Sequence, residues 1–404
     1  MTALHLEGFD NPRTYRPAPW ARALMLIAAS LVLAVGGWFV FLIIGSQGPA
    51  SGGPLMVLSI PAGLAGLLAA YLVASALRAR VMLSADRIEV YGALRARRMA
   101  RADISGRRLL QVGHGQTMTQ LVPSVAGMKA LKFSRRGWSA DSSFDMWLDS
   151  LPDLDAQERH ASEAEIAANV ELGNTAEERM ARLAAGKKVA TALTVISWAA
   201  AAWAYMYPHP YAAALLALAL LPWLAIALAA KSAGLYRIDT RRNDVRPSVA
   251  IAIYLPGIVL LTRALQDVGV LEWHSALLYA ALTAALLCWA AVMSDAAVRS
   301  KPAIVILLLA LGGAYGYGVV VLGNSQLDRA PGNHYEVNVL ARRIGGGRNR
   351  TYHLTLAPWG PRSEAREVTV PRALYTNAQP GQAVCIHQGP GALGIPWYAV
   401  SSCW

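Results

Sequence analysis

The chain has 404 residues, of which 55% are hydrophobic and only 15% are charged, and its mean hydropathy is positive. This composition is typical of a protein with several membrane-spanning helices and excludes an ordinary soluble chain. The net charge of +12 would suit a nucleic-acid partner. No recognition motif accompanies this charge, so we expect the chain not to bind nucleic acid.

Seven apolar runs are long enough to cross a membrane, which takes roughly twenty residues for a hydrocarbon core of about 30 Å. The fifth run is the least regular, because Pro256 interrupts it and Arg263 lies near its end. A polar stretch with three arginines precedes the first run, which differs from a cleaved signal peptide, so we expect this segment to be retained. The runs cover residues 22–45, 54–77, 189–207, 211–230, 248–265, 274–294 and 303–323.

The distribution of Lys and Arg predicts the orientation of these helices, because cytoplasmic loops carry more of both residues. The connections 46–53, 208–210 and 266–273 hold neither. The N-terminus and the large insert at 78–188 are therefore predicted to be cytoplasmic, and the C-terminus periplasmic, in a bacterial inner membrane. The basic residues lie at Arg13, Arg16, Arg22, Arg78, Arg80, Lys187, Lys188, Lys231, Arg237, Arg241, Arg242, Arg246, Arg299 and Lys301.

The insert at 78–188 begins with short segments of β-strand character and continues with helical ones. Several strands followed by one closing helix predict a small barrel or bent sheet that is capped at one end. Residues 156–186 read as one amphipathic helix leading into the third span. The expected strands lie at 81–83, 88–91, 107–112, 117–122 and 129–134.

Three features of the insert resemble the bacterial pleckstrin-homology-like (PH-like) domains of membrane proteins. They are the opening hairpin Leu83–Val90, the step Arg101–Ile104 after a basic strand, and the helix Phe144–Leu154 with Trp147. The resemblance covers about residues 80–160, a fifth of the chain. It implies a scaffold that binds lipid headgroups, peptides or no known ligand, and it does not by itself imply an activity.

A dense cluster of arginines lies within this predicted domain. Near the anionic cytoplasmic leaflet each one gains about 1 kcal/mol, so the cluster is a candidate site for anionic lipid or an acidic partner. The alternative is a solvated strand face that only helps to hold the domain in the cytoplasm. Its members are Arg95, Arg97, Arg98, Arg101, Arg107 and Arg108.

The apolar runs hold few polar groups in their interiors, which argues against an ion-coupled pump. Asp267, His274 and Asp295 all fall at predicted helix ends. The glycine-rich segment Gly312–Gly318 of the last helix either packs closely against neighbours or lines a site, and packing is the commoner use.

The segment after residue 325 alternates with period two and predicts a five-stranded sheet or barrel of about 70 residues. It holds Cys385 and Cys403, while Cys288 lies in the sixth apolar run. An oxidising compartment favours a disulfide between Cys385 and Cys403, and the alternative is two free thiols. Four arginines crowd the tip of its first hairpin, where they either meet anionic lipid or polymer or are simply solvated: Arg342, Arg343, Arg348 and Arg350.

The fold class expected is thus a mainly α membrane protein with a PH-like insert and a small C-terminal all-β domain. The predicted divisions are 1–77 (tail and two spans), 78–160 (PH-like domain), 161–188 (connecting helix), 189–324 (five spans) and 325–404 (periplasmic β domain).

Sequence motifs of catalysis are missing from the chain: it has no Walker loop, HExxH, GxSxG or CxxC. We therefore expect no catalytic residue, no metal and no cofactor. The predicted function is a non-enzymatic adaptor, sensor or assembly factor that contacts membrane lipids and a possible protein partner. The alternative is a transporter or channel subunit for an apolar or lipidic solute, with Pro256 and the glycines of the last helix along its path.

Overall fold

The computed structural model describes residue 9 and residues 11–45, 54–112, 116–239, 242–346 and 350–403. The chain divides into two compact units, Met1–His160 and Ala161–Trp404. The predicted connection 46–53 and the predicted loop and hairpin arginines Arg241 and Arg348 lie outside the described residues.

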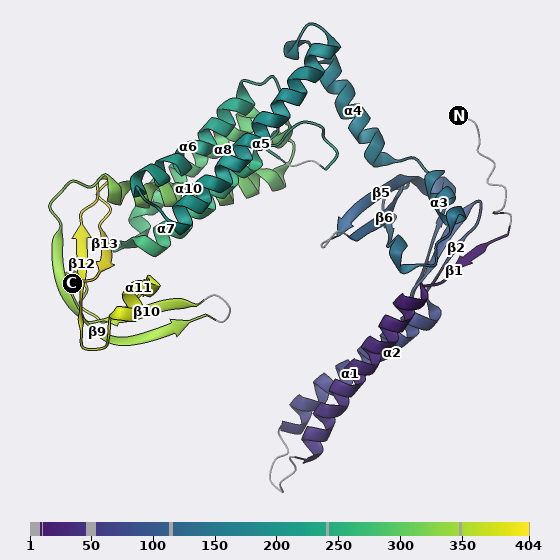
Figure 1. Ribbon diagram of the computed structural model, residues 1–404, viewed down its shortest axis with the longest axis horizontal. Coiled ribbons are helices and arrows are strands. Elements are labelled where there is room, and N and C mark those ends of the chain that lie inside the picture. The colour runs from purple at the N-terminus through teal and green to yellow at the C-terminus, as the bar shows by residue number, and fades with distance from the viewer. Residues whose placement is uncertain are drawn as a thin grey trace. The chain divides into compact units, whose positions relative to one another are not determined.

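The first unit contains a pair of long helices, α1 (Pro19–Gly45) and α2 (Pro54–Arg78), which pack side by side (Figure 1). Pro19–Trp38 of α1 is long and apolar enough to cross a membrane. In α2 the apolar stretch with described side chains, Gly63–Arg78, is shorter than a span. A seventh span therefore stays a prediction, while six helices of the described chain have the length and composition of membrane spans.

Two antiparallel sheets and one helix form the rest of this unit, which we call the N-terminal β module. The first sheet has the order β1-β2-β3-β4 and the second the order β5-β6-β7. The helix α3 (Ser142–Asp149) follows the last strand. The strands are β1 (Arg13–Tyr15), β2 (Arg80–Leu83), β3 (Arg87–Tyr91), β4 (Ala96–Ala100), β5 (Ile104–Val112), β6 (Gln116–Pro123) and β7 (Leu131–Phe133).

The sequence predictions missed β1 and ended the closing helix at Leu154 instead of Asp149. β1 comes from the N-terminal tail and pairs with β2, with Arg13 opposite Leu83. A three-residue strand is too short to show an alternating pattern, which explains the omission. The helix ends early because Pro152 follows its last turn.

The core of the module lies between the two sheets and α3. Trp147 is fully buried, and its indole Nε1 donates a hydrogen bond to the backbone oxygen of Ser84 at 2.9 Å. Asp141 caps α3 by accepting from the amide of Phe144 at 2.9 Å, and it also accepts from the hydroxyl of Tyr15. These hydrogen bonds hold the N-terminal tail, the first sheet and α3 together.

The single amphipathic helix expected at 156–186 is wrong in detail, because the chain breaks between two helices there. α4 (Leu154–Ala168) is followed by a short 3-10 turn (Val170–Leu172), and α5 (Ala176–Met206) then begins. Gly173 has a φ of 156°, and Thr175 with Glu178 forms a capping box at the start of α5. Such a box is a strong helix start, so the new helix begins where the sequence looked continuous.

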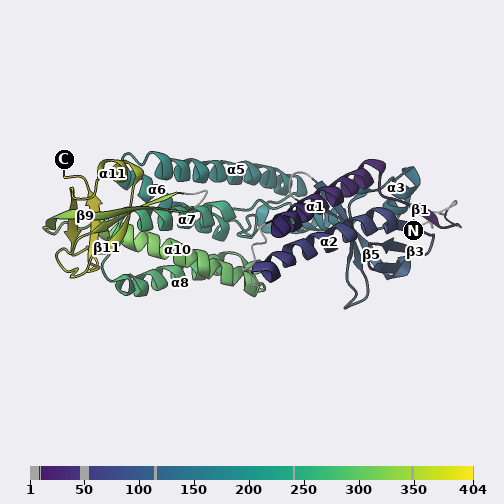
Figure 2. The same ribbon diagram turned by 90° about the horizontal axis from the view of Figure 1, so that it is seen from below.

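The second unit is built on a helical bundle whose long members run side by side (Figure 2). Each of the five has the length and apolar composition of a membrane span, which together with α1 indicates a multi-pass membrane protein. α7 continues through Pro256 as one helix, so the least regular predicted span is present. The five helices are α5, α6 (Tyr211–Ala230), α7 (Ala250–Asp267), α8 (Leu277–Ser294) and α10 (Pro302–Gln326).

Two glycines of α10, Gly316 and Gly318, lie at close helix contacts. A Cβ atom at Gly316 would stand 2.4 Å from the backbone oxygen of Ala280 in α8, and one at Gly318 would stand 2.6 Å from the backbone of Leu260 in α7. These glycines therefore serve packing, the commoner of the two uses considered. α7 and α10 also meet at Gly257, where a Cβ would lie 3.0 Å from that of Tyr315.

The connection between α6 and α7 is held to its neighbours by buried charged side chains. The guanidinium of Arg237 lies 3.0 Å from the carboxylate of Asp295 and 3.2 Å from that of Asp244. Asp244 also accepts from the hydroxyl of Ser162 in α4 at 2.8 Å. Lys301 pairs with the buried Asp239. Asp295, expected at a helix end, is thus a structural anchor of this connection.

The C-terminal β domain is a six-stranded sheet with the order β11-β10-β9-β12-β13-β8. Five strands match the prediction, and the sixth, β8 (Gly269–Val270), comes from the connection after α7. The remaining elements are α11 (Arg372–Asn377) and the strands β9 (Asn333–Gly345), β10 (Thr351–Leu356), β11 (Arg366–Val370), β12 (Ala383–Gly389) and β13 (Trp397–Ser401).

The two cysteines of this domain lie at disulfide distance, with their Cα atoms 5.0 Å apart, while Cys288 is free and buried. The domain is also fastened to the bundle by the end of α10. The side chain of Asn324 donates to the oxygen of Ile395 and accepts from the amide of Leu393, at 2.9 and 2.8 Å. Asp328 accepts from the indole of Trp397 at 2.8 Å.

Candidate functional site

The six arginines of the predicted cluster do not form one patch. Arg95 and Arg97 are exposed at the turn between β3 and β4 and on β4. Arg98, also on β4, pairs with the buried Glu89 at 3.5 Å. Strand β4 and the turn before it therefore carry the arginines of the cluster that stay exposed to solvent.

The other three arginines of the cluster are used inside the module. Arg101 donates to the backbone oxygen of Ser150 at 3.4 Å. Arg107 forms an ion pair with Asp149, at the end of α3, and Arg108 pairs with Glu158 in α4. These contacts hold α3 and the start of α4 against β5.

Arg95 and three arginines from outside the predicted cluster line a cavity of about 360 Å³, which we call the juxtamembrane pocket. It lies where α2 ends and β2 begins, against the turn between β3 and β4. Its four arginines come from three segments of the chain, and its lining holds no acidic residue. The lining comprises Arg16, Leu77, Arg78, Ala79, Arg80, Tyr91, Gly92, Ala93, Leu94, Arg95 and Ala96.

Local structure fixes three of the four arginines in place. The backbone oxygen of Arg16 accepts from the amide and the hydroxyl of Ser139, both at 3.0 Å. The guanidinium of Arg80 lies over the ring of Tyr91, 4.5 Å from its centre, and these residues face each other across β2 and β3. The amide of Gly92 donates to the oxygen of Arg95 at 2.9 Å, which closes the turn.

The charges of the pocket are not compensated within the described part of the chain. No carboxylate among those residues pairs with Arg16, Arg78 or Arg95. A second cavity of about 360 Å³ adjoins, shares Arg16 and Leu77, and adds Arg22 from the first turn of α1. The Nε of Arg22 is buried without an acceptor. The region therefore offers several guanidinium groups to an anion from outside the chain.

Exposed leucines flank the pocket. Leu77, in the last turn of α2, is 75% exposed, and Leu94, at the tip of the β3–β4 turn, is 79% exposed. Both line the cavity together with the arginines. An apolar tip beside basic residues is the arrangement that meets a bilayer surface, where acyl chains lie next to charged headgroups.

The sequence reasoning identified Arg95 but not its partners in the pocket. Arg16, Arg78 and Arg80 were used only to orient the helices, because nothing in a linear sequence brings residue 16 next to residues 78–95. The available signal was their position directly beside two predicted spans, where basic residues meet lipid phosphates.

Comparisons of the chain with family models, with curated proteins and with solved structures found no match. In the part of the chain that the structure describes, no group of three or more His, Cys, Asp or Glu side chains is placed to hold a metal ion.

Proposed function

We propose that this chain is a non-enzymatic inner-membrane adaptor or sensor. Its N-terminal β module, a PH-like domain, lies on the cytoplasmic membrane surface and binds anionic lipid headgroups in the juxtamembrane pocket. Its C-terminal β domain works on the periplasmic face, where a protein partner binds. The single observation that supports this most is the group of four arginines that line the juxtamembrane pocket, whose lining holds no acidic residue.

Headgroup binding follows from the chemistry of the lining. Guanidinium groups bind phosphate oxygens in pairs, and each basic residue near an anionic surface gains about 1 kcal/mol. Leu77 and Leu94 add exposed apolar surface for the adjoining acyl chains. A protein ligand would need acidic side chains placed against several arginines at once, whereas a bilayer surface offers phosphates and acyl chains side by side.

The adaptor role is supported by the way each soluble part is fastened. In the first unit, Asp155 of α4 accepts from the amide of Leu109 at 2.8 Å. In the second unit, Ser162 of the same helix donates to Asp244, whose carboxylate pairs with Arg237. The C-terminal domain is joined to α10 through Asn324 and to the α7 end through β8. Within the second unit, a change at the C-terminal domain can therefore reach the bundle through ordered contacts.

Transport remains the alternative, and the helix contacts do not favour it. The path it requires would run between α7 and α10, beside Pro256 and the glycines. Gly257 and Gly318 instead allow the two backbones to approach closely at this place.

Lipid retention by the full chain tests the proposed binding. The protein is reconstituted in phosphatidylcholine nanodiscs with a minority of phosphatidylglycerol, and native mass spectrometry counts the lipids that stay bound. Replacing Arg78 and Arg95 by Gln should weaken phosphatidylglycerol retention about 30-fold, from the gain per residue near an anionic surface.

Arg97→Gln is the matched control, because Arg97 lies on the next strand but outside the pocket. Its effect should be much smaller than that of the double variant. A loss of about 5-fold from Arg97→Gln, half the free-energy effect of the double variant, would mean that overall basicity, and not the pocket, holds the lipid.

A further inference from the structure

A second basic cavity lies in the other unit, between the last turn of α7 and the C-terminal β domain. It measures about 240 Å³, and we call it the α7 pocket. It adjoins a cavity of about 290 Å³ along β11, with which it shares Gln266, Asp267 and the end of that strand. Its full lining is Arg263, Gln266, Asp267, Arg350, Thr351, Tyr352, Thr369, Val370, Pro371 and Arg372.

Three arginines from distant segments meet in this cavity. Arg263 belongs to α7, Arg350 directly precedes β10, and Arg372 is the first residue of α11. Arg350 was expected in a cluster at the hairpin tip. Neither Arg343, which pairs with Glu367, nor Arg342, whose guanidinium lies 4.2 Å from the ring centre of Tyr375, lines the cavity.

One carboxylate lines the pocket, and its interactions are already made within the protein. Asp267 pairs with Arg263, one helical turn away, at 2.7 Å. It also accepts a hydrogen bond from the hydroxyl of Tyr211 in α6. Arg263 lies over the ring of Tyr211 as well, 5.4 Å from its centre. This triad neutralises Asp267 and leaves the other two arginines as net positive charge.

Arg350 and Arg372 have no carboxylate partner among the described residues, and both are exposed at the cavity. The Nε of Arg263 is buried and has no acceptor. A buried donor without a partner costs free energy, so an anion that supplied an acceptor would be favoured at this place. Gln266 adds a neutral amide to the same wall.

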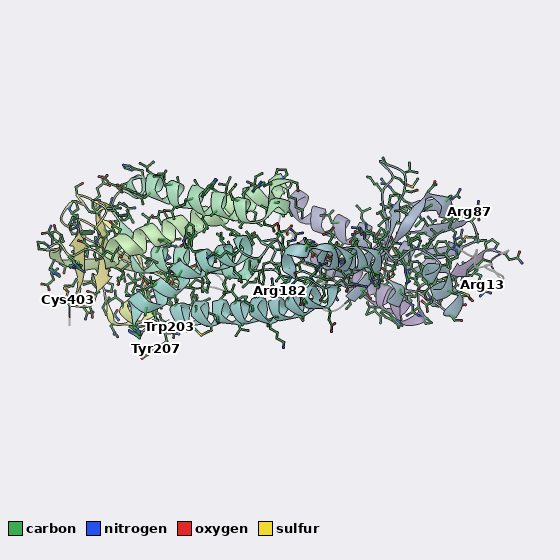
Figure 3. The ribbon with its side chains drawn as sticks, turned by 90° about the horizontal axis from the view of Figure 1, so that it is seen from above. Arg13, Arg87, Arg182, Trp203, Tyr207 and Cys403 are labelled. Carbon is green, nitrogen blue, oxygen red and sulfur yellow. A yellow bond between two sulfur atoms is a disulfide. The ribbon has the colours of Figure 1, made fainter. Side chains whose placement is uncertain are left out.

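The α7 pocket also lies at the end of a helix, Ala250–Asp267, that has the length and composition of a membrane span. Aromatic side chains that mark membrane surfaces gather at this end of the helices, where Trp203 and Tyr207 lie near the C-terminal domain (Figure 3). Tyr207 and Trp273 are 69% and 65% exposed. Leu265, which lines the adjoining cavity, is 62% exposed and offers apolar surface to an acyl chain.

We infer that the α7 pocket binds the phosphodiester headgroup of an anionic phospholipid from the leaflet at this end of the helices. Arg350 and Arg372 contact the phosphate, Arg263 supplies the donor at the back of the cavity, and the acyl chains lie along Leu265. The bound lipid bridges α7 and the β10–β11 part of the C-terminal domain. This inference does not depend on the juxtamembrane pocket, because it rests on other residues in the other unit.

The test uses the full chain with Arg78→Gln and Arg95→Gln already present, so that lipid bound at the juxtamembrane pocket does not contribute. In phosphatidylcholine nanodiscs containing phosphatidylglycerol, adding Arg350→Gln and Arg372→Gln should weaken retention of phosphatidylglycerol about 30-fold further. Arg329→Gln, an exposed arginine outside the cavity, is the matched control and should leave retention unchanged. Equal retention in the two variants, or a loss of about 5-fold from Arg329→Gln itself, overturns the inference.

Two further measurements separate the lipid from other anions and from misfolding. Inorganic phosphate added in excess should not displace phosphatidylglycerol, because it lacks the acyl chains; displacement would overturn the assignment to a lipid. A photoreactive phosphatidylglycerol should crosslink the unmutated chain within residues 350–372, which requires no variant to fold. Crosslinks that all fall outside this segment and outside α7 would also overturn the inference.

Discussion

Arg237 and Asp295 form an ion pair of 3.0 Å in which both side chains are almost excluded from solvent, at 12% and 1% exposure. The carboxylate of Asp295 also accepts from the amides of Ile238 and Ala297. One side chain thus joins the connection after α6 to the start of α9 (Ala296–Arg299). Removing Asp295 leaves the buried Arg237 with Asp244 as its one remaining carboxylate partner among the described residues and leaves two amides without their acceptor.

Asp295→Ala should therefore lower the free energy of unfolding by about 3–5 kcal/mol. The measurement is the thermal unfolding midpoint of the full chain in detergent. Glu272→Gln is the control, because Glu272 is 63% exposed and should leave the midpoint nearly unchanged. If the two variants unfold at the same temperature, the ion pair of Arg237 and Asp295 does not stabilise the connection after α6.

Two glycines of α10 should respond in opposite ways to the same substitution. Gly316→Ala places a methyl group against the backbone oxygen of Ala280 and should cost about 1–3 kcal/mol through overpacking. At Gly313 a Cβ would meet nothing within 4 Å, so Gly313→Ala should be neutral or stabilising by up to about 1 kcal/mol. The thermal unfolding midpoints of the two variants measure the difference. Equal destabilisation would show that α8 and α10 do not meet at Gly316.

The pair Cys385 and Cys403 closes a loop with a sequence separation of 18 residues. A crosslink over a loop of this size stabilises a fold by about 3 kcal/mol, mainly by restricting the unfolded chain. Reductant should therefore destabilise the C-terminal domain of the native protein and should have no effect on the Cys385→Ser, Cys403→Ser variant. Alkylation of unfolded, unreduced protein should modify Cys288 alone; three modified cysteines would show that no bond forms.

Burial, followed by the hydrogen bond to Asp141, raises the pKa of Tyr15 to about 12. A raised pKa means that the folded state holds the proton more tightly than the unfolded state does. In the unfolded state a tyrosine has a pKa of about 10. The stability from this group is complete below pH about 10 and is lost as pH rises towards 12. The near-ultraviolet titration of the native protein minus that of Tyr15→Phe should show one tyrosine ionising near pH 12. A difference centred near pH 10 would mean that Tyr15 is solvated.

The spans and most strands were predictable because their patterns are local. A span such as 211–230 can be predicted from its apolar composition alone. A hairpin such as β9–β10 can be predicted from alternating apolar residues on either side of a glycine turn. β1, β8 and both arginine pockets were not predictable, because they join residues far apart in sequence. Arg16 reaches its cavity through pairing of the tail with β2, and Arg263 meets Arg372 only because β8 draws the C-terminal domain to the end of α7.

Labelling of single cysteines shows whether the two β domains lie on opposite faces of the membrane, as we propose. In a Cys288→Ser background that keeps the Cys385–Cys403 pair, a cysteine replaces either Arg97 or Gln379, and intact cells are treated with a membrane-impermeant thiol reagent. The account predicts labelling at position 379 in intact cells and at position 97 only after the membrane is permeabilised. Labelling of both positions from the same side would contradict it.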